Sequence, residues 1–234
     1  MRKAIALAAL MVLGASVWAQ VHVIQDVDYQ IEGRTQEYQL ALRADINAGT
    51  EFADRAALDA YVADKVQVLR NERVLESADI DVAVGEPLPD GRMPVVLTVR
   101  TVDTWNIVAL PYFRYDSNLG LLLSIRGRDY DFLGSMEALR VNLNRDQDLD
   151  GNASWGMDAD FSYPFPAWGL DWVWSLGGAF SIPEDGDPAA ASLETSLGLS
   201  KPLGPGTLEA TLGQVAYFNR QDSSGGYYDD AFYL

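Results

Sequence analysis

Hydrophobic and polar side chains alternate along the chain from Trp105 onward, in runs that predict about eight β-strands. In each run, residues of one parity are mainly apolar, and residues of the other parity are mainly polar or small. Successive side chains of a strand point to opposite faces, so every strand would have one apolar face. The clearest apolar sets are Leu139, Val141 and Leu143; Trp155, Met157, Ala159, Phe161 and Tyr163; Leu170, Trp172, Trp174 and Leu176; and Leu193, Leu197 and Leu199.

Two kinds of connector separate these strands. Short turns rich in Pro and Gly alternate with longer, acidic loops, and a membrane-spanning up-and-down barrel has this asymmetry because its two rims face different compartments. The predicted short turns are Phe132–Ser135, Pro164–Gly169 and Lys201–Gly206. The predicted long loops are Arg145–Ser154, Ile182–Ala189 and Asn219–Asp230.

A soluble β-sandwich would also alternate, but its outward face is usually charged and its loops are not sorted by length. Aromatic side chains also gather near the predicted strand ends, where amphipathic rings would meet the two membrane interfaces. The sequence therefore favours an antiparallel transmembrane β-barrel segment of about eight strands. The aromatic residues are Trp105, Tyr115, Trp155, Tyr163, Trp168, Phe180, Tyr217 and Phe218.

The preceding part of the chain predicts a small α+β module. Loose alternation over residues 23–31 predicts a strand, and a four-residue spacing over 38–46 predicts a short helix that ends at Asn47-Ala48-Gly49. The buried face of this helix would be Tyr38, Leu42 and Ile46. A second helix would begin after Asp54, an N-cap residue, and end near Asn71. Its buried side would be Leu58, Tyr61, Val62, Lys65 and Leu69.

Two more strands complete the module, over residues 78–84 and 97–99, and Pro87–Gly91 is a strong turn signal between them. The order strand, helix, helix, strand, strand predicts a compact β-α-α-β-β fold. The module has no nucleophile–base pair, phosphate loop or metal-ligand spacing. We therefore expect a binding module or a spacer, and not an enzyme.

The start of the chain resembles a secretory signal peptide. Arg2 and Lys3 precede a short apolar stretch, and Val17-Trp18-Ala19 forms a small-residue cleavage site. The apolar stretch is shorter than the roughly 20 residues of a spanning helix. The sequence thus predicts a signal peptide over 1–19, a folded module over 20–104 and a barrel segment over 105–234.

Composition narrows the chemistry further. The 234 residues carry a formal charge of −17, which would repel the phosphates of nucleic acids. The chain has no cysteine, so its stability must come from packing and strand pairing. Its single histidine, His22, is expected at the surface and leaves little basis for imidazole catalysis. We expect no cofactor.

One acidic segment, Asp146–Gly151, matches the opening of a calcium-binding loop. The twelfth position of that pattern is Met157, where a bidentate glutamate is needed, and no helices flank the segment. An acidic hairpin loop accounts for it better, and no metal is predicted.

Several short sequence segments in both parts of the chain resemble those of a known architecture. In the module they are Tyr29–Thr35, Ala48–Phe52, Leu69–Ser77 and Val95–Val99. Together with the order of elements, they resemble a POTRA domain, the periplasmic repeat of the BamA/TamA outer-membrane assembly superfamily. The segments Asp103–Trp105, Leu110–Gly120 and Asp129–Gly134 resemble the junction and the first barrel hairpins of the same superfamily.

The resemblance implies two binding edges. In the superfamily, a module edge accepts extended segments, which here implies Ala78, Asp79, Ile80, Asp81, Val82, Ala83 and Val84. The first barrel strand pairs weakly with the last, and clients enter there, which implies a seam at Ile107, Ala109, Pro111, Phe113 and Tyr115. Pro111 would delete a ladder hydrogen bond within this strand. In the alternative, the module strand is a plain edge blunted by its aspartates, and Pro111 is an ordinary edge proline.

The resemblance implies an outer-membrane component, with its module in the periplasm, that assembles or inserts other proteins without covalent chemistry. Its partners would be outer-membrane lipid, unfolded outer-membrane protein clients and accessory periplasmic or lipoprotein subunits. The alternatives are a two-partner-type secretion transporter, or a passive porin or adhesin anchored by the module. Because the barrels of the superfamily have more than eight strands, we expect this chain to hold the module and the front part of a barrel.

Overall fold

The computed structural model describes residues 20–204, 206–218 and 228–233. The chain forms two compact units. The first comprises the residues up to Gln30, Arg43–Asn71 and Ala78–Thr101, and the second comprises Ile31–Leu42, Glu72–Ser77 and the chain from Val102 onward. The predicted signal peptide, residues 1–19, lies outside the described residues.

The module has the predicted order of elements and one additional short strand. Strands β1 (His22–Glu32), β2 (Glu51–Phe52), β3 (Leu75–Val84) and β4 (Met93–Asp103) form a four-stranded sheet in the order β2-β1-β4-β3. The pairing of His22 with Phe52 of β2 buries the histidine, which is 7% exposed. Its predicted surface position is therefore wrong.

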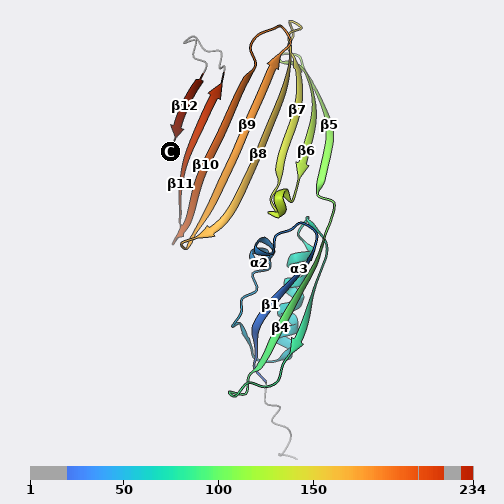
Figure 1. Ribbon diagram of the computed structural model, residues 1–234, viewed down its shortest axis with the longest axis vertical. Coiled ribbons are helices and arrows are strands. Elements are labelled where there is room, and N and C mark those ends of the chain that lie inside the picture. Colours follow the sequence, from blue (N-terminus) through green and yellow to red (C-terminus); the bar gives the residue numbers. More distant parts are fainter. Residues whose placement is uncertain (1–19, 205, 219–227, 234) are drawn as a thin grey trace, which may run out of the picture. The chain divides into compact units, whose positions relative to one another are not determined.

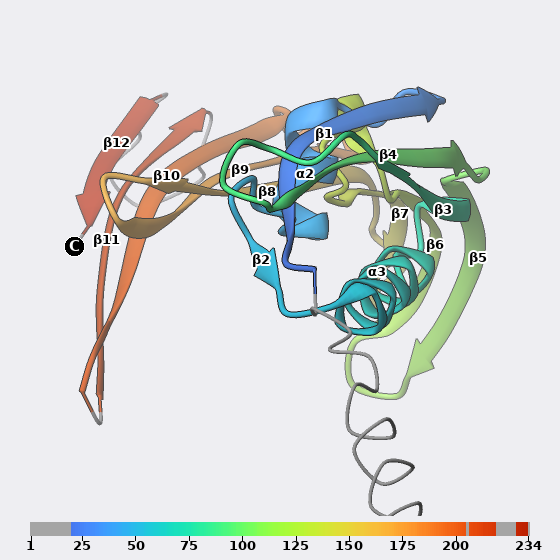
Figure 2. The same cartoon turned by 90° about the horizontal axis from the view of Figure 1, so that it is seen from below.

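Helix α3 (Arg55–Arg70) lies against one face of this sheet (Figure 2). The carboxylate of Asp54 accepts a hydrogen bond of 2.8 Å from the amide of Ala57, which confirms the predicted N-cap. Three of the predicted buried residues, Leu58, Val62 and Leu69, are buried. The fully buried apolar side chains of the first unit are Ile24, Ala44, Leu58, Leu69, Val95, Leu97 and Val99.

Helix α2 (Glu37–Ala44) forms where a short helix was predicted, but it buries a different face. Leu40 and Ala44 are fully buried, whereas Tyr38 is 51% and Leu42 38% exposed. Of the predicted face only Ile46 is buried, and it lies beyond the end of the helix. A four-residue spacing fits both sets, and only the tertiary surroundings choose between them. The helix also ends earlier than predicted because Asp45 adopts a positive φ of 46°. Among the described residues, no helix is both long and apolar enough to cross a membrane.

The second unit contains an antiparallel sheet of eight strands, each paired with its neighbours in sequence (Figure 1). This confirms the predicted number and direction of strands. β5 and β12 lie at its two edges. The strands are β5 (Ile107–Asp116), β6 (Gly120–Asp129), β7 (Leu139–Gln147), β8 (Ala153–Ala167), β9 (Leu170–Pro183), β10 (Ala190–Leu203), β11 (Gly206–Phe218) and β12 (Tyr228–Tyr233).

The connectors fall into two sets, one at each end of the strands, but the bounds of the predicted short turns were wrong. β10 continues to Leu203 and β11 begins at Gly206, so the turn predicted over Lys201–Gly206 was too wide, whereas the connector between β6 and β7 runs from residue 130 to 138 and is longer than predicted.

The turn predicted over Pro164–Gly169 was also too wide. β8 continues through Pro164 and Pro166 to Ala167, so that only Trp168-Gly169 remain in the turn to β9. β7 accompanies β8 only between Ala153 and Asp160, so beyond that point β8 has a single neighbour. A proline whose nitrogen faces the unpaired side removes no ladder hydrogen bond.

Replacement of Leu69 by alanine should destabilise the module by about 2–5 kcal/mol, because it leaves a cavity under α3. The neighbouring Val68, which is 37% exposed, is the matched control, and Val68→Ala should cost about 0.5 kcal/mol or less. Hydrogen exchange of the α3 amides measures both effects in the intact chain. Equal losses of protection would contradict the assignment of the buried face.

Candidate strand-binding edges and the rim cluster

The pairing register places side chains of one kind on each face of the eight-stranded sheet. Pro111 lies opposite Ile125, Ile125 opposite Leu143, and Leu143 opposite Met157. Because directly opposed residues point to the same face, this row continues one apolar face across four strands. The alternation predicted for these strands is therefore confirmed.

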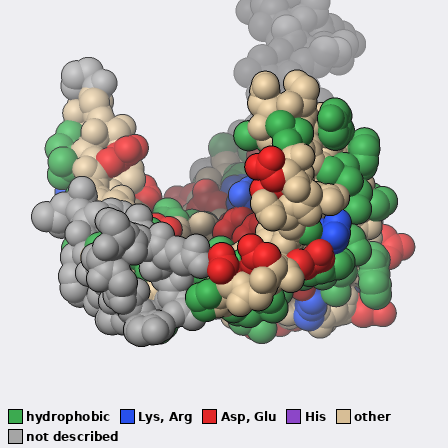
Figure 3. Space-filling model, turned by 90° about the horizontal axis from the view of Figure 1, so that it is seen from above, with side chains coloured by type: hydrophobic (Ala, Val, Ile, Leu, Met, Phe, Trp, Pro, Cys, Tyr) green, Lys and Arg blue, Asp and Glu red, His purple; other side chains and the backbone are tan. Residues whose placement is uncertain are grey.

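The apolar face is exposed. Phe113 is 65%, Ile125 52%, Trp155 55% and Leu212 55% exposed, although these residues lie on strands from β5 to β11. Figure 3 shows many hydrophobic side chains on the outer side of the wall at the right, with charged side chains both among them and toward the hollow. A contiguous exposed apolar surface of this extent marks a contact with lipid or with another protein.

Polar side chains on the other face are joined across the strands. Asp158 of β8 accepts hydrogen bonds from two asparagines of β7, at 2.6 Å from Asn142 and 2.9 Å from Asn144. Arg140 lies 3.4 Å from Asp160 on the same pair of strands. These contacts satisfy polar groups on a face that is not packed against an apolar core.

Alternate residues of β5 direct their backbone N–H and C=O groups to opposite sides of the strand, either to β6 or to the open edge. The amide of Tyr130 donates a hydrogen bond of 3.0 Å to the carbonyl oxygen of Asn106, one step before the β5–β6 ladder begins at Ile107 and Asp129. Backbone groups of alternate residues point to the same side of an antiparallel strand. Even-numbered residues of β5 therefore bond to β6, and odd-numbered residues point to the open edge.

All the predicted seam residues are odd-numbered, so the fold brings them together at this edge. Their backbone groups point away from β6 and their side chains lie on the apolar face. Pro111 lies opposite Ile125 in an unbroken ladder, and its missing N–H belongs to the open edge. Proline here removes a donor from the edge itself and leaves the β5–β6 ladder complete, so the weak seam and the ordinary edge proline both remain predictions for Pro111.

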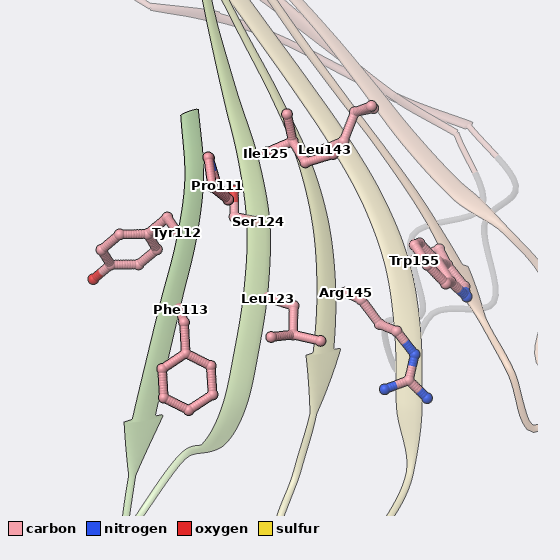
Figure 4. A pocket seen from close by; sticks show the side chains of 9 residues that line it. All are labelled: Pro111, Tyr112, Phe113, Leu123, Ser124, Ile125, Leu143, Arg145 and Trp155. Atoms are coloured by element: carbon pink, nitrogen blue, oxygen red, sulfur yellow. The ribbon is translucent and has the colours of Figure 1, made fainter. Parts of the chain in front are cut away.

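An open groove of about 600 Å³ runs along the apolar face beside this edge (Figure 4). Pro111 and Phe113 of β5 form one side, and Arg145 and Trp155 lie on the far side. The guanidinium of Arg145 is paired with both carboxylate oxygens of Glu184 at 3.2 Å and faces the Trp155 ring, 5.9 Å from its centroid. The charge of Arg145 is thus compensated where the groove ends.

The second predicted edge, β3, is also a true sheet edge. Two of its backbone groups are occupied by side chains of the module. Arg70 donates a hydrogen bond of 2.9 Å to the carbonyl of Ala78, and Asp79 accepts one of 3.0 Å from the amide of Ile80. By alternation, the backbone groups of Val82 point to the same edge as those of Ala78 and Ile80.

A buried carboxylate cluster lies where the β6–β7 turn meets the segment that follows β1. Asp131 is fully buried, accepts a hydrogen bond of 2.7 Å from the amide of Met136, and accepts one of 3.2 Å from the hydroxyl of Thr35. Asp103 accepts bonds from the amides of Arg34 and Thr35 at 2.7 and 2.9 Å. We call Arg34, Thr35, Asp103, Asp129 and Asp131 the rim cluster.

Two glycines allow the close approach in the rim cluster. Both have positive φ, 152° at Gly33 and 75° at Gly134. A Cβ atom on Gly33 would lie 2.2 Å from the carboxylate of Asp103, and one on Gly134 would lie 2.1 Å from the carbonyl oxygen of Arg34. The amide of Gln36 donates a hydrogen bond of 2.9 Å to the carbonyl of Gly134. Both positions therefore require glycine.

Charge in the rim cluster is arranged around Arg34. Its guanidinium pairs with Asp129, and the hydrogen bond between them raises the pKa of Arg34. Burial raises the pKa of the Asp131 carboxyl, and the hydrogen bond from the Met136 amide opposes this only in part. In the sequence, Tyr29–Thr35 and Asp129–Gly134 stood out only as two separate segments that resemble a known family, and nothing indicated that they meet.

The acidic loop between β7 and β8 is closed by its own side chains. Asp148 accepts hydrogen bonds of 2.9 Å from the amides of Asp150 and Asn152, and its second oxygen accepts one of 2.9 Å from the Asn152 side chain. The bond from the Asn152 side chain lowers the pKa of Asp148. Within the described residues, no group of three or more His, Asp or Glu is arranged to hold a metal ion.

Comparison with known proteins gives structural matches. No family model and no curated protein matches the chain. The structure of BamA from Haemophilus ducreyi lacking POTRA domains 1–3 aligns with 89% of the chain at a TM-score of 0.51 and 13% identity. CdiB from Acinetobacter baumannii aligns with 91% at a TM-score of 0.43 and 15% identity. The chain spans 42% of that BamA chain and 39% of that CdiB chain.

The alignment with BamA shows that this chain shares its fold. The predicted resemblance is thereby confirmed for the architecture, a small α/β module followed by an antiparallel sheet that aligns with that structure over most of the chain.

The stability of the rim cluster should depend on the protonation of Asp131. A carboxyl with a raised pKa stabilises the fold when protonated, so its contribution is complete below the unfolded pKa of about 4 and is lost as the pH rises through the raised pKa. The protection of the Met136 amide against hydrogen exchange is measured at each pH in the unchanged protein and in Asp131→Asn. The ratio of the first value to the second should fall as the pH rises toward neutral. Asp26→Asn, an exposed change in β1, is the control. A ratio that is constant or rises would contradict the raised pKa.

Proposed function

We propose that this protein acts at the outer membrane by adding extended strands of client polypeptides to its own unpaired sheet edges. The observation that carries this proposal is the edge strand β5, whose outward backbone groups belong to the same residues that present side chains to the exposed apolar face. A client strand paired there would extend the sheet and its apolar face together.

The exposed apolar face supports a membrane location. Its rows of aliphatic and aromatic side chains cross β5 to β11, and lipid tails solvate such a face at no hydrophobic cost. The polar face carries charged and amide ladders, as expected for a surface turned to water. We assign the rim that holds the tight turn between β8 and β9 to the periplasm, because barrels of this kind have mainly short periplasmic turns.

Backbone pairing would supply the affinity for clients. Each main-chain hydrogen bond contributes about 0.5–1.5 kcal/mol net, and it reads strand shape with little regard for sequence. At β5, Pro111 withholds one donor from any incoming strand. The seam would therefore bind a strand and release it more readily than a complete edge would.

The module edge is the proposed first contact. Because Arg70 and Asp79 occupy the groups of Ala78 and Ile80, an incoming strand would pair mainly with the far part of β3, around Val82. Asp81 at this edge is paired with Arg100 of β4, which compensates its charge. Module and seam would act in sequence on the same extended client.

Depletion of the protein from its host distinguishes assembly from secretion. If it assembles other membrane proteins, the amounts of several outer-membrane barrels should fall together. A dedicated secretion transporter would lose one secreted client, and a passive porin or adhesin would leave all other proteins unchanged. Unchanged outer-membrane barrels would refute an assembly role.

A proline at the module edge should weaken client capture without unfolding the sheet. Val82→Pro removes one outward N–H and should lower the yield of cross-links to an unfolded barrel protein by roughly twofold to tenfold, the effect of one hydrogen bond. Val82→Thr keeps the N–H and the strand preference, and its yield should match that of the unchanged protein. Equal yields for the two variants would exclude pairing at this edge.

A further inference from the structure

Two arginines without acidic partners lie on the polar face beside the open edge, Arg114 on the edge strand β5 and Arg126 on its neighbour β6. Arg114 and Arg126 are both exposed, and neither forms an ion pair with any part of the chain that the structure describes. This is unusual in a chain with 34 acidic and 17 basic residues. The nearest acid on the same strand, Asp116, accepts hydrogen bonds from the amides of Asn118 and Leu119 in its own turn.

The guanidinium of Arg126 is carried toward the open edge. Arg126 belongs to β6 and lies opposite Leu110, but its guanidinium carbon stands 3.5 Å from the centroid of the Tyr112 ring on β5. Figure 4 shows the Tyr112 ring and the Pro111 ring on opposite sides of β5. Arg114 follows on the same face of β5, so two positive charges flank Tyr112 along the edge strand.

A neighbouring arginine behaves differently. Arg128 lies on the same strand and face as Arg126, two residues further along. Its guanidinium donates hydrogen bonds to the carbonyl of Gly127 at 2.8 Å and to Asn142 of β7 at 3.4 Å. Arg128 therefore leans into the sheet, away from the edge, whereas Arg126 leans toward the edge.

The backbone polarity of β5 fixes which client residues would meet these charges. Client residues opposite the odd-numbered residues of β5 form the hydrogen-bonded pairs, and their side chains join the apolar face. Those opposite Tyr112 and Arg114 occupy non-hydrogen-bonded pairs, where the Cα atoms are only about 4.5 Å apart. Their side chains lie on the polar face, directly beside the arginines.

We propose that the β5 edge selects client strands that carry acidic side chains at the alternate positions turned to the polar face. This inference rests on the proposed function, and it adds a chemical preference to a backbone contact that otherwise ignores sequence. Basic client residues at these positions would be repelled by Arg114 and Arg126, so the two arginines also disfavour basic strands.

The test uses the full chain in phosphatidylcholine vesicles and three strand peptides. All three share the same apolar residues at one parity and carry Glu, Gln or Lys at the other parity. Because the natural chain has no cysteine, Ala109→Cys on the edge strand gives a unique thiol whose disulfide with a peptide cysteine verifies the site. Peptide affinity is measured by fluorescence anisotropy at low and at high salt.

The Glu peptide should bind most tightly, the Gln peptide less tightly and the Lys peptide least. The double variant Arg114→Gln/Arg126→Gln should lower the affinity for the Glu peptide by roughly threefold to tenfold, as expected for two exposed ion pairs, and should equalise the Glu and Gln peptides. Arg128→Gln is the matched control and should change the affinity by less than about twofold. High salt should remove the preference.

A charge-reversal variant distinguishes the loss of a charge preference from the loss of folding. Arg114→Glu/Arg126→Glu should gain affinity for the Lys peptide, and a gain cannot come from a misfolded protein. If the three peptides bind the unchanged protein equally, strand addition stands and the acidic preference is overturned. If no peptide forms the disulfide with Ala109→Cys, both the preference and the proposed function are overturned.

Discussion

Antiparallel pairing with a side-chain period of two is the constraint on which the second unit depends. A shift of any strand by one residue would exchange its apolar and polar faces, so the register cannot slip without exposing polar rows to the wrong surroundings. The unbroken ladders from β5 to β11 keep rows such as Pro111, Ile125, Leu143 and Met157 in line. The exposed apolar face and the asparagine–aspartate ladder are two consequences of this one register.

The same alternation determines which backbone groups and side chains each sheet edge presents. At β5 a residue that points its backbone outward also points its side chain to the apolar face, so a partner strand meets both features at once. At β3 the module already satisfies part of its edge with Arg70 and Asp79. An edge that is partly satisfied in this way resists uncontrolled aggregation yet still offers backbone groups to a strand.

The rim cluster depends on backbone conformation at two glycines, and not on strand pairing. Gly33 and Gly134 let two chain segments approach within a distance that any Cβ atom would prevent, and this approach buries the carboxyl of Asp131. The local cost of burying that acid is offset only in part by its hydrogen bonds to Thr35 and Met136 and by the charge of Arg34.

Much of the architecture followed from local pattern. Alternation located the strands, Asp54 marked the start of α3, and Leu58, Val62 and Leu69 marked its buried side, because these signals depend only on neighbours in sequence. Helix α2 shows the limit of such signals. Its four-residue spacing fitted two faces equally, and the surroundings buried Leu40 and Ala44 instead of Tyr38 and Leu42.

The sequence by itself determined the strands, their apolar parity and the order of elements, since periodicity and turn chemistry are local properties. Only the tertiary structure decided that the missing N–H of Pro111 faces the open edge, that Pro164 and Pro166 remain within β8, and that Thr35 meets Asp131. Each of these depends on which strand lies alongside and on which side its backbone groups point. The direction of a strand's hydrogen bonds and the contacts between distant segments produce no periodic pattern in the sequence, so the sequence alone could not predict them.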